Sequence, residues 1–192
     1  MRIDAIVVFI VILACGSSSF TQSTNQRQSD RLGFSGSWVL DETKNKLIKQ
    51  GRTRIVTGLE IVIREPEIKI KETVRDNGTE RTEEFLFFSD GRGELNKLPA
   101  LARSKEKEEV KSHTKWEKDR LVINYSLRWQ LASDTMYFDV QETWQLAGGG
   151  NVLVHTKKLG NPQSAFHKTR VLPEVMETTT WVYNRAPVQV SN

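Results

Sequence analysis

The sequence holds a single cysteine among its 192 residues, and that thiol, Cys15, lies close to the amino terminus. An intramolecular disulfide needs two cysteines and a cysteine-based metal site needs several, so this chain can form neither. Histidine is also scarce, because His113, His155 and His167 are widely spaced, without the pairing typical of metal ligands. We expect His113 and His155 to lie on the polar faces of their strands. The sequence therefore predicts no metal and no cofactor, and hydrophobic burial must stabilise the fold.

Long apolar runs are absent as well. The longest is Ala5 to Ala14, and its ten residues are half of the roughly 20 that a membrane-spanning helix requires. It follows a short segment that carries Arg2, and this arrangement is typical of a signal peptide. We therefore expect residues 1–14 to be a signal peptide and the rest of the chain to be exported.

The residues at the end of this run, Ile12, Leu13, Ala14 and Cys15, resemble a bacterial lipobox. The resemblance implies that Cys15 is acylated and that its lipid attaches the protein to a membrane. Gly16 and Ser17 follow without an aspartate, which in lipoproteins implies the outer membrane of the bacterial cell envelope. The alternative is an ordinary signal peptide cut between Ala14 and Ser19, which would give a secreted or periplasmic protein. Residues 15–33, rich in Ser, Thr, Gln and Asn, predict a disordered tether, or simply a disordered terminus.

Charge of one sign is not in excess. The 28 basic residues are interspersed with 24 acidic ones, so a nucleic-acid partner is not expected. The densest basic cluster lies at residues 44–54 and fits either anionic lipid headgroups or a solvated loop. Gly-x-Ser-x-Gly, phosphate-loop and His-Glu-x-x-His motifs are missing, so the sequence does not predict an enzyme.

What the sequence does have, from residue 34 onward, is alternation of apolar and polar residues with a period of two, the pattern of half-buried strands. Turn residues at Asp76–Gly78 and Gly148–Asn151 separate strands that we expect to be antiparallel. Residues 45–57 and 160–175 are predicted loops, with a short helix at 45–50 or 95–104. The predicted fold is an all-β, up-and-down barrel of about 8–10 strands over residues 34–185, with a tail at 186–192. A two-sheet sandwich and an open half-barrel are the alternatives. We expect about nine strands, at residues 36–40, 59–64, 67–75, 79–88, 110–116, 121–129, 135–146, 152–158 and 178–183.

The first of these strands contains Gly36 and Trp38, and this Gly-x-Trp motif resembles the first strand of lipocalin-like, or calycin-type, barrels. In that family the tryptophan closes the narrow end of the barrel, and a basic residue near the end of the last strand packs over it. Arg185 occupies the matching position in this chain. The chain also resembles uncharacterised exported bacterial proteins with such a strand. Lipocalin disulfides and the other lipocalin motifs are missing, so the resemblance implies a fold and no particular ligand.

Two glutamates interrupt the apolar rows of their strands. Glu72 follows Ile68 and Ile70, and Glu142 follows Phe138 and Val140, so the pattern predicts that both carboxylates point inward. A β-bulge that shifts the alternation, or a wet barrel mouth, is the alternative. Because a lone buried carboxylate is unfavourable, a ligand or a raised pKa would accompany it. The candidate ligand-binding residues are Glu72, Glu142, Tyr125, Trp129 and Phe138.

Three functions remain open at this point. The first is a binding module that holds a small apolar or amphiphilic molecule in the barrel. The second is a structural or interaction protein of the cell envelope with a filled barrel and no ligand. The third, less favoured, is an enzyme that uses a glutamate of raised pKa.

Overall fold

The computed structural model describes residues 31–45, 54–99, 107–130, 135–164 and 178–187. Cys15, the predicted signal peptide and residues 15–30 of the predicted tether lie outside the described residues. Ten strands make up nearly all of the described chain, and a short 3-10 turn, η1 (Gly148–Gly150), joins two of them. The strands are β1 (Gly36–Leu40), β2 (Arg54–Arg64), β3 (Glu67–Asp76), β4 (Thr79–Phe88), β5 (Glu94–Pro99), β6 (Lys107–Glu117), β7 (Arg120–Gln130), β8 (Thr135–Ala147), β9 (Val152–Ser164) and β10 (Thr178–Arg185).

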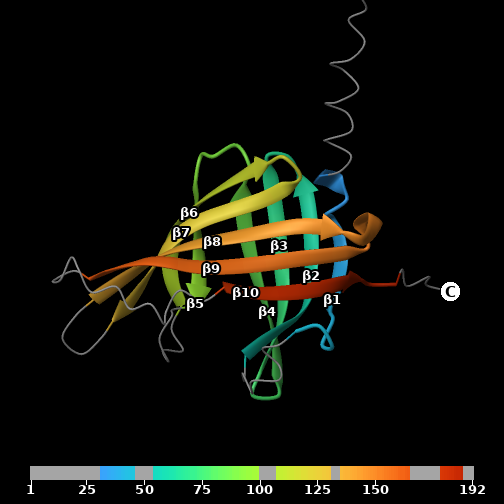
Figure 1. Cartoon of the computed structure of the whole chain (residues 1–192), viewed down its shortest axis with the longest axis horizontal. Coiled ribbons are helices and arrows are strands. Elements are labelled where there is room, and N and C mark those ends of the chain that lie inside the picture. Colours follow the sequence, from blue (N-terminus) through green and yellow to red (C-terminus); the bar gives the residue numbers. More distant parts are fainter. Residues whose placement is uncertain (1–30, 46–53, 100–106, 131–134, 165–177, 188–192) are drawn as a thin grey trace, which may run out of the picture.

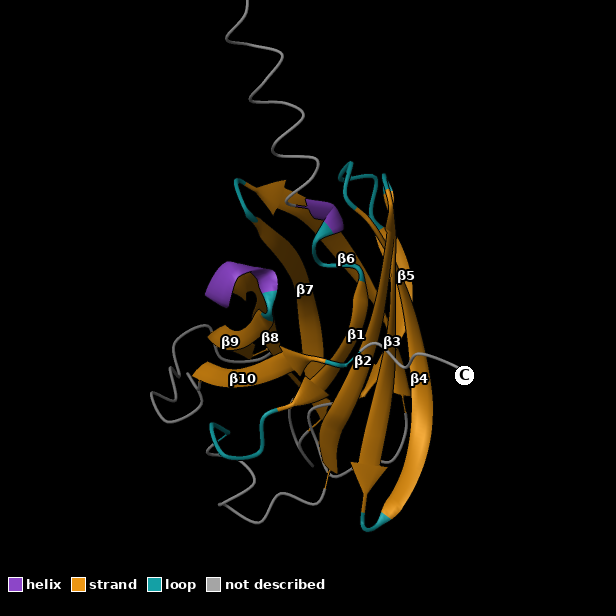
Figure 2. Cartoon of the chain, turned by 90° about the vertical axis from the view of Figure 1, so that its right-hand side faces the viewer, coloured by secondary structure: helices purple, strands orange, loops and turns teal. Residues whose placement is uncertain are grey.

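All ten strands belong to one antiparallel sheet, in the order β4-β3-β2-β1-β10-β9-β8-β7-β6-β5. The first and last strands pair in the middle of this order, where Trp38 lies opposite Arg185. The sheet curls so that β2–β4 face β7–β9, and the two halves cross at a steep angle (Figures 1 and 2). The predicted antiparallel up-and-down barrel is confirmed, and it is nearly closed.

The seam of the barrel lies between β4 and β5, which follow each other in the chain but are not paired as strands. Side chains of β5 bridge it. The Asn96 amide accepts a hydrogen bond from the Leu86 amide nitrogen at 3.0 Å and donates one to the Leu86 carbonyl at 2.8 Å. The Glu94 carboxylate accepts a bond from the Phe88 amide nitrogen at 3.2 Å. Two polar side chains thus take the place of backbone pairing at Leu86 and Phe88 on the edge of β4.

One end of the barrel, the capped end, is closed by Trp38 and Arg185. The indole nitrogen of Trp38 donates to the Phe34 carbonyl at 3.0 Å, and Trp38 is 1% exposed. Arg185 lies over the indole and donates hydrogen bonds to the carbonyls of Gly33, Ser35 and Gly150. One guanidinium therefore ties the chain before β1 to the turn before β9. The opposite end of the barrel, which we call the loop end, contains the C-terminal ends of β1, β5, β7 and β9.

Three expectations for individual segments were wrong. Residues 95–99 form strand β5 and not a helix, because the polar residues of this short strand face inward and close the seam. Residues 54–57 extend β2, where a register shift between Val56 and Gly58 interrupts the alternation that the prediction relied on. Residues 160–164 extend β9, since Pro162 falls at a bulge where two residues oppose one on β8.

Most of the core lies in the capped half of the barrel. Its buried side chains come from both halves of the sheet and include Phe34, Leu59, Ile61, Ile68, Ile70, Phe87, Leu121, Ile123, Leu153 and Tyr183. Among the described residues, no helix combines the length and the apolar character that crossing a membrane would require.

Candidate functional site

A layer of ionisable side chains crosses the interior of the barrel, midway between the capped end and the loop end. Its members project from inward-facing positions of five strands and interrupt otherwise apolar rows. We call this set the polar layer: Glu72 on β3, Glu83 on β4, Tyr125 on β7, Glu142 on β8, and His155 and Lys157 on β9.

Glu142 is the centre of the layer's hydrogen bonds. It accepts bonds from the Tyr125 hydroxyl and from His155 Nε2, the latter at 3.0 Å. The Lys157 ammonium lies 3.3 Å from the same carboxylate and donates to the Tyr125 oxygen at 2.8 Å. Burial by itself would raise the pKa of Glu142, but the Lys157 charge and the His155 and Tyr125 hydrogen bonds outweigh it and hold that pKa well below its ordinary value. Glu142 is therefore ionised, and its negative charge is well compensated.

His155 lies between two indole rings. Its ring is stacked on Trp144 at a centroid distance of 3.7 Å and on Trp181 at 4.8 Å. The register explains the stack, because His155 is the cross-strand partner of Trp144 on one side and of Trp181 on the other. This stack fixes the ring that bonds to Glu142. The Trp144 indole nitrogen is buried without a hydrogen-bond partner among the described residues.

Glu83 is the second compensated carboxylate. Its side chain is 1% exposed and lies 3.0 Å from Arg54, 2.9 Å from Arg81 and 3.6 Å from Lys107. Burial raises the pKa of Glu83, but these cations together lower it below its usual value. Since Arg54, Arg81 and Lys107 all lie toward the loop end, they place positive charge on that side of the layer.

Glu72 differs from both, because its carboxyl group has no hydrogen-bond partner among the described residues. It lies beside Glu83 in the strand register, and its strand is on the far side of the barrel from Glu142. Burial, reinforced by the charge of Glu142, raises the pKa of Glu72 to about 7. Burial, together with the charges of Glu72 and Glu142, raises the pKa of Tyr183 well above its ordinary value. At neutral pH Glu72 is thus poised between its neutral and its charged form, in a region of negative potential.

Apolar side chains border the polar layer on both sides. Most of the core occupies the capped side. Val74, Val110, Leu127, Phe138 and Val140, all buried, lie on the loop side, and Val110, Leu127 and Val140 belong to the same core cluster. Along the barrel axis the order is therefore apolar core, polar layer, apolar lining and charged rim. A polar group surrounded in this way is expected to have a partner, because leaving it unpaired in the interior costs about 1–3 kcal/mol.

The structure brings together most of the residues that the sequence singled out. Glu72 and Glu142 point inward, Tyr125 contacts Glu142, and Phe138 is buried on the loop side. Trp129 belongs to β7, but its side chain lies outside the described residues.

The expectation that His155 lies on a polar face was wrong, because it faces inward and is 7% exposed. Sequence reasoning also missed Lys157 and Glu83. Their signal was available: Leu153, His155, Lys157 and Leu159 share one alternating row on β9, as Glu83, Phe85 and Phe87 do on β4. Among the described residues, no group of three or more His, Cys, Asp or Glu side chains is arranged to hold a metal ion.

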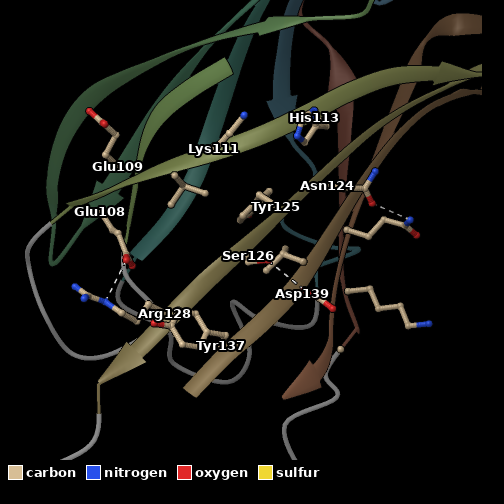
Figure 3. Close-up of a pocket in the computed structure, with 15 residues that line it drawn as sticks. Glu108, Glu109, Lys111, His113, Asn124, Tyr125, Ser126, Arg128, Tyr137 and Asp139 are labelled. Atoms are coloured by element: carbon tan, nitrogen blue, oxygen red, sulfur yellow. Dashed lines mark hydrogen bonds and ion pairs between the residues drawn. The ribbon is translucent and has the colours of Figure 1, made fainter. Parts of the chain in front are cut away.

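A hollow of about 800 Å³ lies over β6–β9 and opens to the outside of the barrel, and its lining includes the inward residues Val110, Tyr125 and Val140 beside outward-facing side chains. We call it the outer groove. Figure 3 shows its lining, in which Ser126 donates to Asp139 and Arg128 pairs with Glu108. Tyr137, 45% exposed, is its prominent aromatic residue. A second hollow, of about 430 Å³, lies at the capped end and is lined by Arg31, Glu65 and Trp116 among others.

Comparisons with known proteins add little beyond the fold. No protein-family model matches the chain, and no curated protein matches it. Among solved structures, the chain is similar to a fatty acid transporter, REP1-NXSQ, solved as a tyrosine-to-phenylalanine mutant. The TM-score is 0.46 at 12% sequence identity, and the match covers 79% of this chain and 97% of the transporter.

Proposed function

We propose that this barrel binds a small amphiphilic molecule, with the polar end of the molecule at the polar layer and its apolar part among the side chains on the loop side. The observation that carries the proposal is the polar layer itself. Six inward ionisable side chains are not needed for stability, since apolar residues of similar volume often stabilise a core as much or more. Their cost is understandable if they orient a ligand.

The order of the layers supports this assignment. A ligand that entered head first from the loop end would bring its head to Glu72 and Tyr125 and leave its apolar part against Val74, Leu127 and Phe138. Burial of an alkyl chain contributes about 0.8 kcal/mol per CH₂ group, so a chain of eight to twelve carbons supplies enough free energy for micromolar binding after the costs of association.

A titration with dodecan-1-ol tests the proposal. The tryptophans flanking His155 supply a fluorescence signal close to the polar layer, and the titration is run below the concentration at which the alcohol aggregates. We expect saturable binding with one equivalent, weakened at least threefold by Tyr125→Phe. Tyr137→Ala, on the outer groove, is the matched control and should leave the affinity within twofold. Absence of saturable binding, or a larger effect of Tyr137→Ala, would contradict the proposal.

We also propose that the protein is exported and anchored in the cell envelope through a lipid on Cys15. The support is the short apolar leader and the four-residue lipobox. Intact mass measured on protein purified from the membranes of its own host should exceed the mass of residues 15–192 by two or three acyl chains. Cys15→Ala should remove that mass and release the protein from the membrane fraction. A mature terminus at residues 15–19 without added mass would favour the secreted or periplasmic alternative.

A second candidate is an interaction protein of the envelope whose barrel holds no ligand. The outer groove favours it, because a hollow of this volume with an exposed tyrosine and mixed polar lining offers a docking surface. In that case no amphiphile enters the barrel.

A further inference from the structure

We propose that the amphiphile recognised by this barrel carries a cationic amine head, and that the Glu72 carboxylate binds it. This inference rests on the proposed function and assigns the chemical class of the ligand. It begins from the contrast among the three glutamates of the polar layer. Glu142 and Glu83 each contact at least one cationic side chain, whereas Glu72 has no hydrogen bond or ion pair within the described residues.

The groups facing Glu72 explain why a cation is favoured over an anion. Glu83 lies beside it, Glu142 projects from the opposite wall, and the Tyr125 and Tyr183 hydroxyls add no charge. Arg54 and Lys157 supply positive charge, but Arg54 is paired with Glu83, and Lys157 is paired with Glu142. Once these pairs are counted, Glu72 is the one acid of the polar layer whose charge is not compensated.

A carboxylate head group would bring a second negative charge beside Glu72 and Glu142, and like charges at close range in the interior repel strongly. A hydroxyl head could hydrogen-bond to Glu72 but would leave its charge uncompensated. A protonated amine supplies both the hydrogen-bond donor and the opposite charge, and such charge-assisted bonds are roughly twice as strong as neutral ones.

The experiment compares three probes that share one chain: dodecylamine, dodecan-1-ol and dodecanoic acid. Affinities of the whole protein are measured by calorimetry or tryptophan fluorescence between pH 5.5 and 8.5, where the amine stays protonated. At pH 8 we expect the amine to bind at least tenfold more tightly than the acid. Its affinity should rise with pH as the neutral form of Glu72 loses its proton, because burial and Glu142 raise that pKa to about 7.

Glu72→Gln supplies the decisive variant. It should weaken amine binding at least tenfold at pH 8, remove most of the pH dependence and leave alcohol binding within threefold. Glu84→Gln, which changes an exposed neighbour on β4, is the matched control and should have no such effect. The pH dependence of amine affinity in the wild-type protein remains a test even if Glu72→Gln does not fold.

The outcomes separate the two proposals. If none of the three probes binds, the proposed function fails, and the choice of head group fails with it. If alcohol or acid binds as well as the amine, or if Glu72→Gln leaves amine affinity unchanged, the barrel binds amphiphiles but the assignment to Glu72 is overturned.

Discussion

Arg185 lies over the ring of Trp38, with its guanidinium carbon 4.2 Å from the ring centroid, although the two residues are 147 positions apart in the chain. The pair joins the first strand to the last at the capped end. It combines a cation-π contact with hydrogen bonds from one guanidinium to three backbone carbonyls.

Replacing Arg185 should therefore destabilise the barrel more than replacing an exposed arginine. We expect Arg185→Ala to lower the free energy of unfolding by about 2–4 kcal/mol, because three carbonyls lose a charged donor and the indole loses its cover. Urea unfolding followed by tryptophan fluorescence measures the change. Arg64→Ala, at an exposed position on β2, should stay within about 0.5 kcal/mol. Equal effects of the two substitutions would contradict this role of Arg185.

Gly36 is required by the same contact. Its φ is +132°, and a Cβ atom there would lie 2.8 Å from Arg185 Nη1. Gly36→Ala is expected to cost about 1–3 kcal/mol, since it combines backbone strain with displacement of the guanidinium. Gly160→Ala, where a Cβ atom meets nothing within 4 Å, is the control and should be nearly neutral. The comparison fails if both variants unfold at the same urea concentration.

The contacts at the capped end are among the features of the fold that the sequence predicted. Gly36, Trp38 and Arg185 formed a motif with a known geometry, and regular alternation was sufficient to predict the antiparallel barrel. The alternation was least reliable at Gly58 and Pro162, where the register shifts. Strand β5 was missed because its inward residues, Glu94 and Asn96, are polar and bond across the seam to a strand that it does not pair with.

The candidate site was harder to predict for a related reason. A row such as Leu153, His155, Lys157 and Leu159 mixes apolar and ionisable residues, and the competing row through Val152 and Val154 looked more apolar. Which row faces inward depends on partners from β8 and β10, and the sequence of β9 alone does not contain that information. Glu72 and Glu142 could be identified because their rows are otherwise strongly apolar.

The seam gives a prediction that is independent of any ligand. Asn96→Ala removes both hydrogen bonds to Leu86, so we expect a loss of about 1–3 kcal/mol and faster hydrogen exchange at the Leu86 amide. Lys97→Ala, next in the strand and exposed, serves as the control. If exchange at Leu86 is unchanged in Asn96→Ala, the side chain does not hold the seam.

Glu72 should make the protein less stable as pH rises. Its pKa is raised to about 7 in the folded barrel by burial and by Glu142, whereas its ordinary value, which applies in an unfolded chain, is 4.5. The folded state therefore binds more protons between these values, and stability is lost as pH rises through about 7. Near pH 4, Glu72→Gln should have the same free energy of unfolding as the wild type. At pH 8 the variant should be more stable by about 1–3 kcal/mol. Urea midpoints across this range measure the difference, and a constant difference at every pH would rule the explanation out.

Glu142 should behave in the opposite way. Its pKa is held below the unfolded value, chiefly because Lys157 and His155 outweigh the effect of burial, so its contribution is present above about pH 4.5 and is lost as pH falls below it. We expect Glu142→Gln to cost about 1–3 kcal/mol at pH 7 and less at pH 3. Glu84→Gln, at an exposed position on β4, controls for the loss of one negative charge alone. A cost that does not shrink in acid would show that the ion pairs are not its source.

Methyl NMR of the isotope-labelled protein with saturating dodecylamine shows directly whether the amphiphile lies inside the barrel. We expect nuclear Overhauser contacts from the alkyl chain to the buried methyl groups of Val74 and Leu127, neither of which lines the outer groove. Contacts confined to the outer groove around Tyr137, or no contacts at a concentration where binding is saturated, would contradict binding inside the barrel.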